Sequence, residues 1–304
     1  MGRELAKFYF SGEQEKRCPN RECGNHRNPE PASFLRKGYY VTKWNGQPVR
    51  RWKCRLCGRS FSSHTFRSYY RQHRPELNDA VFHLYASGMT QRRMALVLKA
   101  NRKTIVRKFR YLALLCRKQH RRVIKRGELQ TSHVQFDEMQ TFEHTKLKPV
   151  TIAVAVRAKT GEIVDMRAAP IPYQGPLAPL AFRKYGPRPS RAKEAATRCL
   201  KKVRACSKPT LTLTTDSHPA YPSWIQKLLP HATHRQTLRR MPERKTDRKN
   251  KDDALFTLNY TCAKVRNDLS RMARKTWVTT KRIARLQAHL NLYLAWVNRY
   301  QIPM

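Results

Sequence analysis

Two aspartates stand where a pair of carboxylates could bind a metal ion. Asp137 ends the apolar, β-rich run 134–137, and Asp216 follows a second such run, 211–215. Alone, either one could be a strand-end cap or a salt-bridge partner. Together, at the ends of neighbouring strands, they could hold one or two Mg²⁺ or Mn²⁺ ions, because hard cations prefer oxygen ligands. Two ions about 4 Å apart clamp the attacking and leaving oxygens of a phosphoryl transfer.

A third ligand is expected from a helix over 254–275. Asn259 lies close to the apolar face of that helix. Asp252 precedes it by seven residues, so both point the same way if the helix starts early. Asp253 and Glu243 are looser candidates. The residues alone leave this choice open.

Four cysteines form a second constellation near the N-terminus. Cys18 and Cys23 make one pair, and Cys54 and Cys57 make another. Both pairs lie in turn-prone sequence, which is typical of two knuckles that hold one tetrahedral, structural Zn²⁺ in a zinc ribbon. The alternative is four unrelated buried thiols, and His26 is a minor ligand candidate. We therefore expect a zinc ribbon over residues 1–75.

Residues 76–118 predict three helices. Thr90 can cap the second helix, and Asn101 separates it from the third. A short helix, a tight turn and a basic helix are typical of a helix-turn-helix that binds DNA, although a solvated helical face is the alternative. Residues 117–126 are expected to form a basic linker. The cations expected to point outward from the third helix are Arg102, Lys103, Arg107, Lys108 and Arg110.

The overall charge points to a polyanionic partner. The 304 residues carry 64 Lys and Arg against 20 Asp and Glu, a formal net charge of +44. Double-stranded DNA is the natural partner, because neutralised phosphates release counterions; RNA binding is a weaker reading that rests on charge alone. No apolar run reaches the length of about 18 residues that a membrane span needs, and no signal segment is apparent. We expect a cytoplasmic protein of the bacterial nucleoid with reduced cysteines.

The remainder of the chain predicts an α/β core over 130–304. A turn at 159–161 fits a hairpin, a helical segment covers 176–206, and a last helix covers 279–299. Three antiparallel strands, a helix and a fourth strand follow the order of the ribonuclease-H-like fold, in which the first and fourth strands are neighbours. The expected fold class is therefore multidomain: zinc ribbon, helix-turn-helix, then this core with C-terminal helices. The expected strands are 134–137, 150–156, 163–167 and 211–215.

Several segments resemble the catalytic core of bacterial insertion-sequence transposases of the acidic-triad type, insertion sequence one and its zinc-ribbon relatives. The likeness covers nearly the whole chain and is strongest over 132–167 and 210–299. It implies Mg²⁺-dependent cleavage and joining of DNA at element ends, on terminal inverted repeats and target DNA. A homodimer or larger assembly is expected because two ends must meet. The segments are Asp137-Glu138, Val154-Ala155-Val156, Lys159-Thr160-Gly161-Glu162-Ile163, 215–221 and 269–276.

The resemblance also assigns the third ligand position. Counting back from 272–276, the glutamate of the family falls on Asn259. An amide oxygen can ligate Mg²⁺, but it brings no charge and cannot act as a base. The implied catalytic residues are Asp137, Asp216 and Asn259, and the alternative is a zinc-ribbon and helix-turn-helix DNA-binding protein, derived from a transposase, that no longer catalyses. Cations that could grip phosphates beside the site, or form a solvated face, are Arg271, Arg274 and Lys275.

Overall fold

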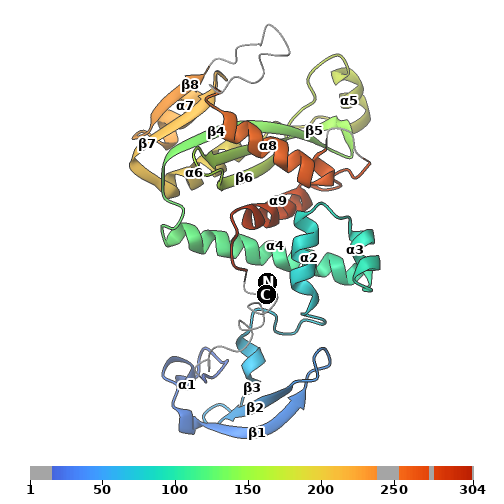
Figure 1. Cartoon of the computed structure of the whole chain (residues 1–304), viewed down its shortest axis with the longest axis vertical. Helices are drawn as coiled ribbons and strands as arrows, with labels where there is room; N and C mark the ends of the chain where they lie inside the picture. The colour runs from blue at the N-terminus through green and yellow to red at the C-terminus, as the bar shows by residue number, and fades with distance from the viewer. Residues whose placement is uncertain (1–15, 238–252, 274–276, 303–304) are drawn as a thin grey trace. The chain divides into compact units, whose positions relative to one another are not determined.

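The computed structural model describes residues 16–237, 253–273 and 277–302, which divide into two compact units (Figure 1). The first unit ends at Asn78, and the second extends from Asp79 to Ile302. The boundary falls at the beginning of a helix rather than between the expected helix-turn-helix and the core. The three helices expected over 76–118 therefore belong, from Asp79 onward, to the same unit as the large sheet.

The first unit is built on a three-stranded antiparallel sheet. Its strands are β1 (Phe34–Val41), β2 (Pro48–Cys54) and β3 (Ser60–Ser62), in the order β1-β2-β3. One helical turn, α1 (Gly24–Arg27), lies between the first two cysteines and the sheet. The buried cluster of this unit consists of three cysteines and two phenylalanines, with Trp52 and Phe66 packed against it. A core this small needs an additional cross-link for stability.

The second unit begins with the three expected helices. They are α2 (Leu77–Ala86), α3 (Gln91–Val97) and α4 (Arg102–Lys125). The Thr90 hydroxyl accepts a hydrogen bond from the backbone of Arg93 at 3.4 Å, and the Asn101 side chain accepts one from Lys103 at 2.8 Å. These are N-caps of the expected kind, since each satisfies a backbone donor of the first turn. The predicted Thr90 cap is confirmed, and Asn101, which was expected only to separate the two helices, also caps α4.

Helix α4 corrects two expectations. The segment 117–126 is not a linker, because the helix continues to Lys125 and ends before Gly127, whose φ of 73° suits the turn. Its apolar face also continues, through Leu112, Cys116, His120 and Val123, all buried. Lys108 does not point outward: it is 3% exposed. The reason is its spacing, three residues after Ile105 and four before Leu112, which places it on the buried face. Arg102, Lys103, Arg107 and Arg110 are exposed as expected.

A five-stranded mixed sheet forms the centre of the second unit, in the order β6-β5-β4-β7-β8. The pairs β4–β5 and β5–β6 are antiparallel, whereas β7 is parallel to β4 and β8 is parallel to β7. The hairpin turn at 159–161 and the pairing of the first and fourth expected strands are confirmed. Strand β8 was not expected. The strands are β4 (Thr131–Glu143), β5 (Thr145–Arg157), β6 (Ile163–Pro170), β7 (Ser207–Asp216) and β8 (Thr233–Thr237).

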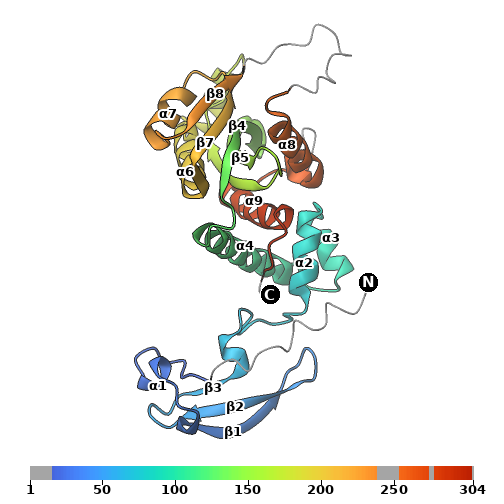
Figure 2. The same cartoon turned by 60° about the vertical axis from the view of Figure 1, so that its left-hand side comes forward.

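Helices cover both faces of this sheet (Figure 2). Helices α6 (Ala192–Cys206) and α7 (Tyr221–Leu228) pack on one face, and α8 (Phe256–Asp268) and α9 (Ile283–Val297) pack on the other. A short helix, α5 (Ala178–Tyr185), precedes α6. None of the helices in the described ranges is long and apolar enough to cross a membrane.

Helix α8 is shorter than the helix expected over 254–275. It ends at Asp268, and Leu269 then takes an extended conformation and buries its side chain completely. The Asp268 carboxylate accepts a hydrogen bond from the Tyr293 hydroxyl at 2.6 Å, which ties the end of α8 to α9. A 3₁₀ turn, Ser270–Met272, follows. The helix end is therefore fixed by tertiary contacts that have no local signal.

Candidate functional site

The sheet brings Asp137 and Asp216 to the same place. Strands β4 and β7 are parallel, and Phe136 pairs with Thr215, so the two aspartates occupy the next position on neighbouring strands. Side chains alternate between faces along a strand, and Phe136 packs with α6 and α7. The aspartates therefore share the opposite face, the one that α8 covers. Both are half-buried. We refer to Asp137 and Asp216 as the acidic pair.

The carboxylates of the acidic pair are oriented by local donors. One oxygen of Asp137 accepts hydrogen bonds from the backbone of Glu138 at 2.6 Å and from the Tyr221 hydroxyl at 3.2 Å. Asp216 accepts a bond from the backbone of His218 at 3.1 Å. Burial, followed by the charges of nearby carboxylates including the acidic pair, raises the pKa of Tyr221. Tyr221 therefore stays protonated and donates. Sequence reasoning missed this role, although Tyr221 lies in the segment 215–221.

Removing the Tyr221 hydroxyl should perturb the acidic pair only mildly. We expect Tyr221→Phe to lower any metal-dependent cleavage rate about tenfold, because a hydrogen bond to a charged group contributes about 1.5 kcal/mol or more. Tyr293→Phe is the matched control, since it removes a hydroxyl that also donates to an aspartate, Asp268. Initial rates of plasmid nicking measure both variants. Equal rates for the two variants would show that Tyr221 does not position Asp137.

Gln135 ties helix α8 to strand β4 beside the acidic pair. Its side-chain nitrogen donates to the Ala254 carbonyl at 2.7 Å, and its oxygen accepts from the Leu258 backbone at 2.8 Å. Gln135 precedes Asp137 by two residues and so lies on the same face. Burial, and then the charge of Asp137, raises the pKa of Cys262 on α8 to about 11.

Asn259 follows Leu258, whose backbone nitrogen donates to Gln135. Its side chain is exposed, and its nitrogen donates to the Asp253 carboxylate at 2.8 Å. This bond turns Asp253 toward Asn259, so the two candidates for the third ligand lie together. Asp252 and Glu243, the other two candidates, lie outside the described residues. In ranges 16–237, 253–273 and 277–302, no third His, Cys, Asp or Glu joins the acidic pair at metal-sharing distance.

The four cysteines do form a ligand set. The sulfurs of Cys18, Cys23, Cys54 and Cys57 all lie within 4.8 Å of one another. The Sγ atoms of Cys18 and Cys57 are 3.3 Å apart, and those of Cys23 and Cys54 are 3.8 Å apart. A tetrahedral Zn²⁺ with bonds of about 2.3 Å requires sulfurs ~3.8 Å apart, so the cluster fits this ion. His26 is not part of this ligand group, which among the described residues contains only the four cysteines; its Nδ1 bonds to the Cys18 carbonyl at 2.6 Å.

The surroundings of the cysteines also suit thiolates. Burial alone would raise the pKa of Cys54, but hydrogen bonds from the Cys57 backbone, the Asn25 side chain and the Leu56 backbone lower it to about 6. The Asn25 nitrogen lies 3.3 Å from the Cys54 sulfur. Burial raises the pKa of Cys18 to about 12. A divalent cation among the four would offset that cost by stabilising the thiolate.

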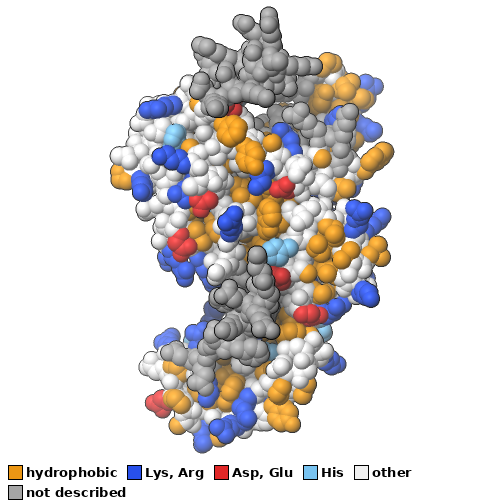
Figure 3. Space-filling model, viewed as in Figure 1, with side chains coloured by type: hydrophobic (Ala, Val, Ile, Leu, Met, Phe, Trp, Pro, Cys, Tyr) orange, Lys and Arg blue, Asp and Glu red, His pale blue; other side chains and the backbone are white. Residues whose placement is uncertain are grey.

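Not every cation expected to bind phosphate is available for it. On the face in Figure 3, Lys and Arg side chains are widespread and carboxylates are few. Arg271 is half-buried, and burial lowers its pKa while the nearby Tyr85 hydroxyl raises it. It therefore packs in the protein rather than forming part of a solvated face. Arg274 and Lys275 lie outside the described residues.

An open groove of about 530 Å³ lies along the end of β4. Gln140, three residues beyond Asp137, begins the β4 side of the groove, and Arg266 of α8 and Lys146 of β5 add two cations. Neither aspartate of the acidic pair lines this groove.

Comparison with known proteins provides no assignment. No protein-family model matches the chain, and no curated protein shows significant similarity to it. Function is therefore inferred from the residues and their geometry.

Proposed function

We propose that this protein is a DNA transposase with a ribonuclease-H-like core that cleaves and joins DNA in the presence of Mg²⁺ or Mn²⁺. The observation that carries the proposal is the acidic pair: two carboxylates on one face, at neighbouring positions where β7 ends at Asp216 beside Asp137 in the middle of β4. Adjacent carboxylates repel each other, and a divalent cation relieves this repulsion. The strand order β6-β5-β4-β7-β8 supports the same fold.

Each residue of the proposed site has a separate role. Asp137 and Asp216 would bind the ions, and Asn259 would contribute its amide oxygen, to which no described residue donates a hydrogen bond. When bound, Mg²⁺ activates water and stabilises charge on the leaving oxygen. Water attacks the phosphorus at an element end, the bond to the 3′ oxygen breaks, and this oxygen takes up a proton. The resulting 3′-hydroxyl then attacks a target phosphodiester and displaces its 3′ oxygen.

DNA binding in this proposal comes from parts outside the acidic pair. The four-cysteine unit and the exposed cations of α4 would contact the terminal inverted repeats. The net charge of +44 supports contacts to many phosphates. Cleavage at both ends would need two chains or more on the DNA, which makes a homodimer or larger assembly part of the proposal.

The proposal is tested by a nicking assay. The substrate is a supercoiled plasmid that carries the DNA flanking this coding sequence on both sides, incubated with Mg²⁺, with Mn²⁺ or with EDTA. We expect nicks at defined positions only with a divalent cation. Cation-independent nicking, or none under any condition, would contradict a metal-dependent transposase.

The third ligand gives a separate prediction. If Asn259 completes the metal shell, we expect Asn259→Ala to lower the nicking rate about 10²-fold and to raise the Mg²⁺ concentration required, because an oxygen ligand is lost. Asp253→Ala removes its hydrogen-bond partner and should have a smaller effect. Titration of the rate against Mg²⁺ measures both. A larger loss of rate in Asp253→Ala than in Asn259→Ala would identify Asp253 as the ligand.

The alternative is a zinc-ribbon and helix-turn-helix DNA-binding protein that derives from a transposase and does not cleave. One observation favours it: position 259 carries an exposed, neutral amide where a carboxylate is expected. Sequence-specific DNA binding together with the absence of nicking under all conditions would support this alternative.

A further inference from the structure

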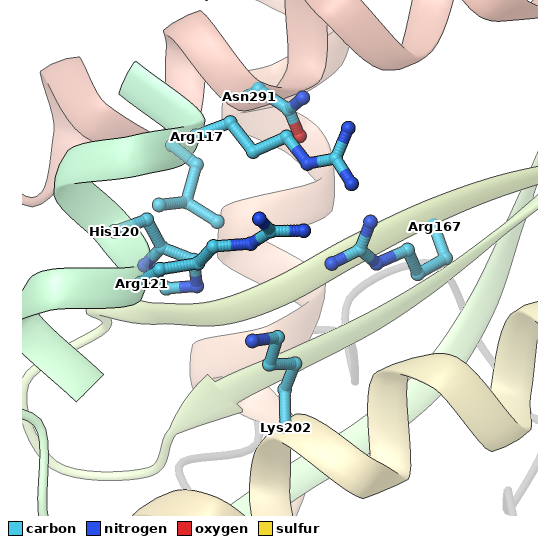
Figure 4. Close-up of a pocket in the computed structure, with 7 residues that line it drawn as sticks. Arg117, His120, Arg121, Arg167, Lys202 and Asn291 are labelled. Atoms are coloured by element: carbon cyan, nitrogen blue, oxygen red, sulfur yellow. The ribbon is translucent and has the colours of Figure 1, made fainter. Parts of the chain in front are cut away.

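Four cationic side chains converge on a small pocket in the second unit (Figure 4). Arg117 and Arg121 come from α4, Arg167 from β6 and Lys202 from α6. Figure 4 shows their charged ends directed toward a common space. The cavity has a volume of about 40 Å³ and opens to solvent. This is more than the 10–15 Å³ that one water needs, so the pocket can admit part of a polyatomic ion. Its remaining lining residues are His120, Asn291 and Leu294.

The positive charge in this pocket is not balanced by the protein. Asp165 is 2% exposed and pairs with Arg167, whose Nε lies 2.6 Å from its carboxylate. In the part of the chain that the structure describes, Arg117, Arg121 and Lys202 form no ion pair within 4 Å. Burial, and then the charges of Arg121 and Arg167, lower the pKa of Arg117, while Asp165 raises it. Asp165 thus pairs directly with one cation, and its single charge is shared with Arg117 and Lys202 at longer range.

His120 lines the same pocket with a neutral imidazole. It is 6% exposed, and burial together with the neighbouring cations lowers its pKa to about 4, with the backbone of Val164 acting in the opposite direction. The Tyr300 hydroxyl accepts from Asn298 at 3.0 Å and lies 3.0 Å from the His120 Nδ1, to which it can donate. The proton of the imidazole is then on Nε2. This buried atom makes no hydrogen bond of normal geometry within the described residues.

The pocket is separate from the acidic pair. Arg167 pairs with Ala153, which pairs with Glu138, so strand β5 lies between Arg167 and β4. Ala153 packs with α6, so Arg167, its partner across the strands, lies on the α6 face. The acidic pair lies on the α8 face. A group bound in the pocket is therefore not the phosphate that reacts at the acidic pair.

We propose that this pocket is a binding site for a phosphate group. Guanidinium groups bind phosphate oxygens bidentately, and a group with several oxygens can accept from donors on three elements at once. An isolated carboxylate has only two oxygens and one charge and would leave most of these donors unused. The phosphate can come from free inorganic phosphate or from a DNA backbone. The site does not depend on catalysis at the acidic pair.

The test uses two double variants matched in charge and location. Arg121→Gln with Lys202→Gln removes two cations of the pocket. Arg122→Gln with Lys201→Gln removes the adjacent cations of the same two helices, which are exposed and do not line the pocket. Thermal unfolding checks that both double variants fold. Calorimetric titration of the full chain with inorganic phosphate at low salt is the first probe. We expect the pocket variant to lose affinity at least tenfold and the control to stay within about twofold of the wild type.

A short DNA duplex is the second probe and separates the two sources. If the pocket holds a DNA phosphate, the slope of log affinity against log salt should fall by about 0.9 in the pocket variant and not in the control. The proposal holds if either probe separates the two double variants, and the probe that does so identifies the source. It is overturned if both probes give the same result for both variants. Neither measurement requires cleavage, so loss of the proposed transposase activity would not affect this outcome.

Discussion

Replacement of Asp137 or Asp216 by asparagine should abolish Mg²⁺-dependent nicking, with a fall in rate of about 10³-fold or more. Each change removes a charged metal ligand and with it several kcal/mol of transition-state stabilisation. Asparagine is nearly the same size as aspartate, so packing should be preserved. Because the two carboxylates repel each other, neutralising one should not lower the thermal stability of the fold. Nicking rates and thermal unfolding of the same preparations measure both effects.

Asp79→Asn provides the control for this experiment. Asp79 is an exposed carboxylate on α2 that pairs only with His83, at 3.6 Å, among the described residues. We expect wild-type nicking from this variant and wild-type DNA affinity from all three. A variant of Asp137 or Asp216 that still nicks and joins DNA at a normal rate would reject the two-carboxylate mechanism. Loss of DNA binding in these variants would instead indicate a structural role for the acidic pair.

Removal of zinc should unfold the first unit and leave the second folded. A structural zinc site contributes on the order of 10 kcal/mol to folding, and the apolar cluster of this unit is small. We expect Cys54→Ser, or treatment with a strong chelator, to remove the bound metal and to expose the β1–β3 sheet to rapid hydrogen exchange. The helices and sheet of 79–302 should keep their protection. Elemental analysis and hydrogen-exchange mass spectrometry measure these two effects.

Cys262→Ser is the control for the zinc experiment, because Cys262 lies in α8 outside the cysteine cluster. It should retain the zinc content of the wild type, about one ion per chain. A wild-type protein without zinc would contradict the assignment of the cluster. So would a Cys54→Ser variant that keeps both its metal and its exchange protection.

The sequence was most informative where chemistry restricts spacing. Two cysteine pairs in turns predict a common metal site, and the cluster of Cys18, Cys23, Cys54 and Cys57 agrees. Apolar runs that end in Asp137 and Asp216 predict two strand ends. Asp216 does end β7, but Asp137 lies in the middle of β4, which continues to Glu143. The pairing of β4 with β7 still places the two aspartates side by side. Hairpin and capping signals, such as those at 159–161 and Thr90, were also read correctly, because each depends on residues close in the chain.

Features that depend on distant contacts were not predictable. The end of α8 at Asp268 depends on Tyr293, which is 25 residues away. The burial of Lys108 was signalled by its spacing from Ile105 and Leu112 and was missed because its charge favours an exposed position. The positioning roles of Gln135 and Tyr221 required the spatial arrangement of β4, α7 and α8. Strand β8 is short and polar, and so lacks the alternation that would reveal it.

The continuity of α4 has a mechanical consequence. Its 24 residues span about 36 Å as one rigid rod, with exposed cations in its first turns and the lining of the cationic pocket near its other end. The centres of the two charged regions are about 13 residues apart, which is about 20 Å along the helix. The helix thus keeps these two positively charged regions at a fixed distance from each other. A duplex that touches both regions must present backbone positions about 20 Å apart, so spacing along the DNA is constrained before any base is read.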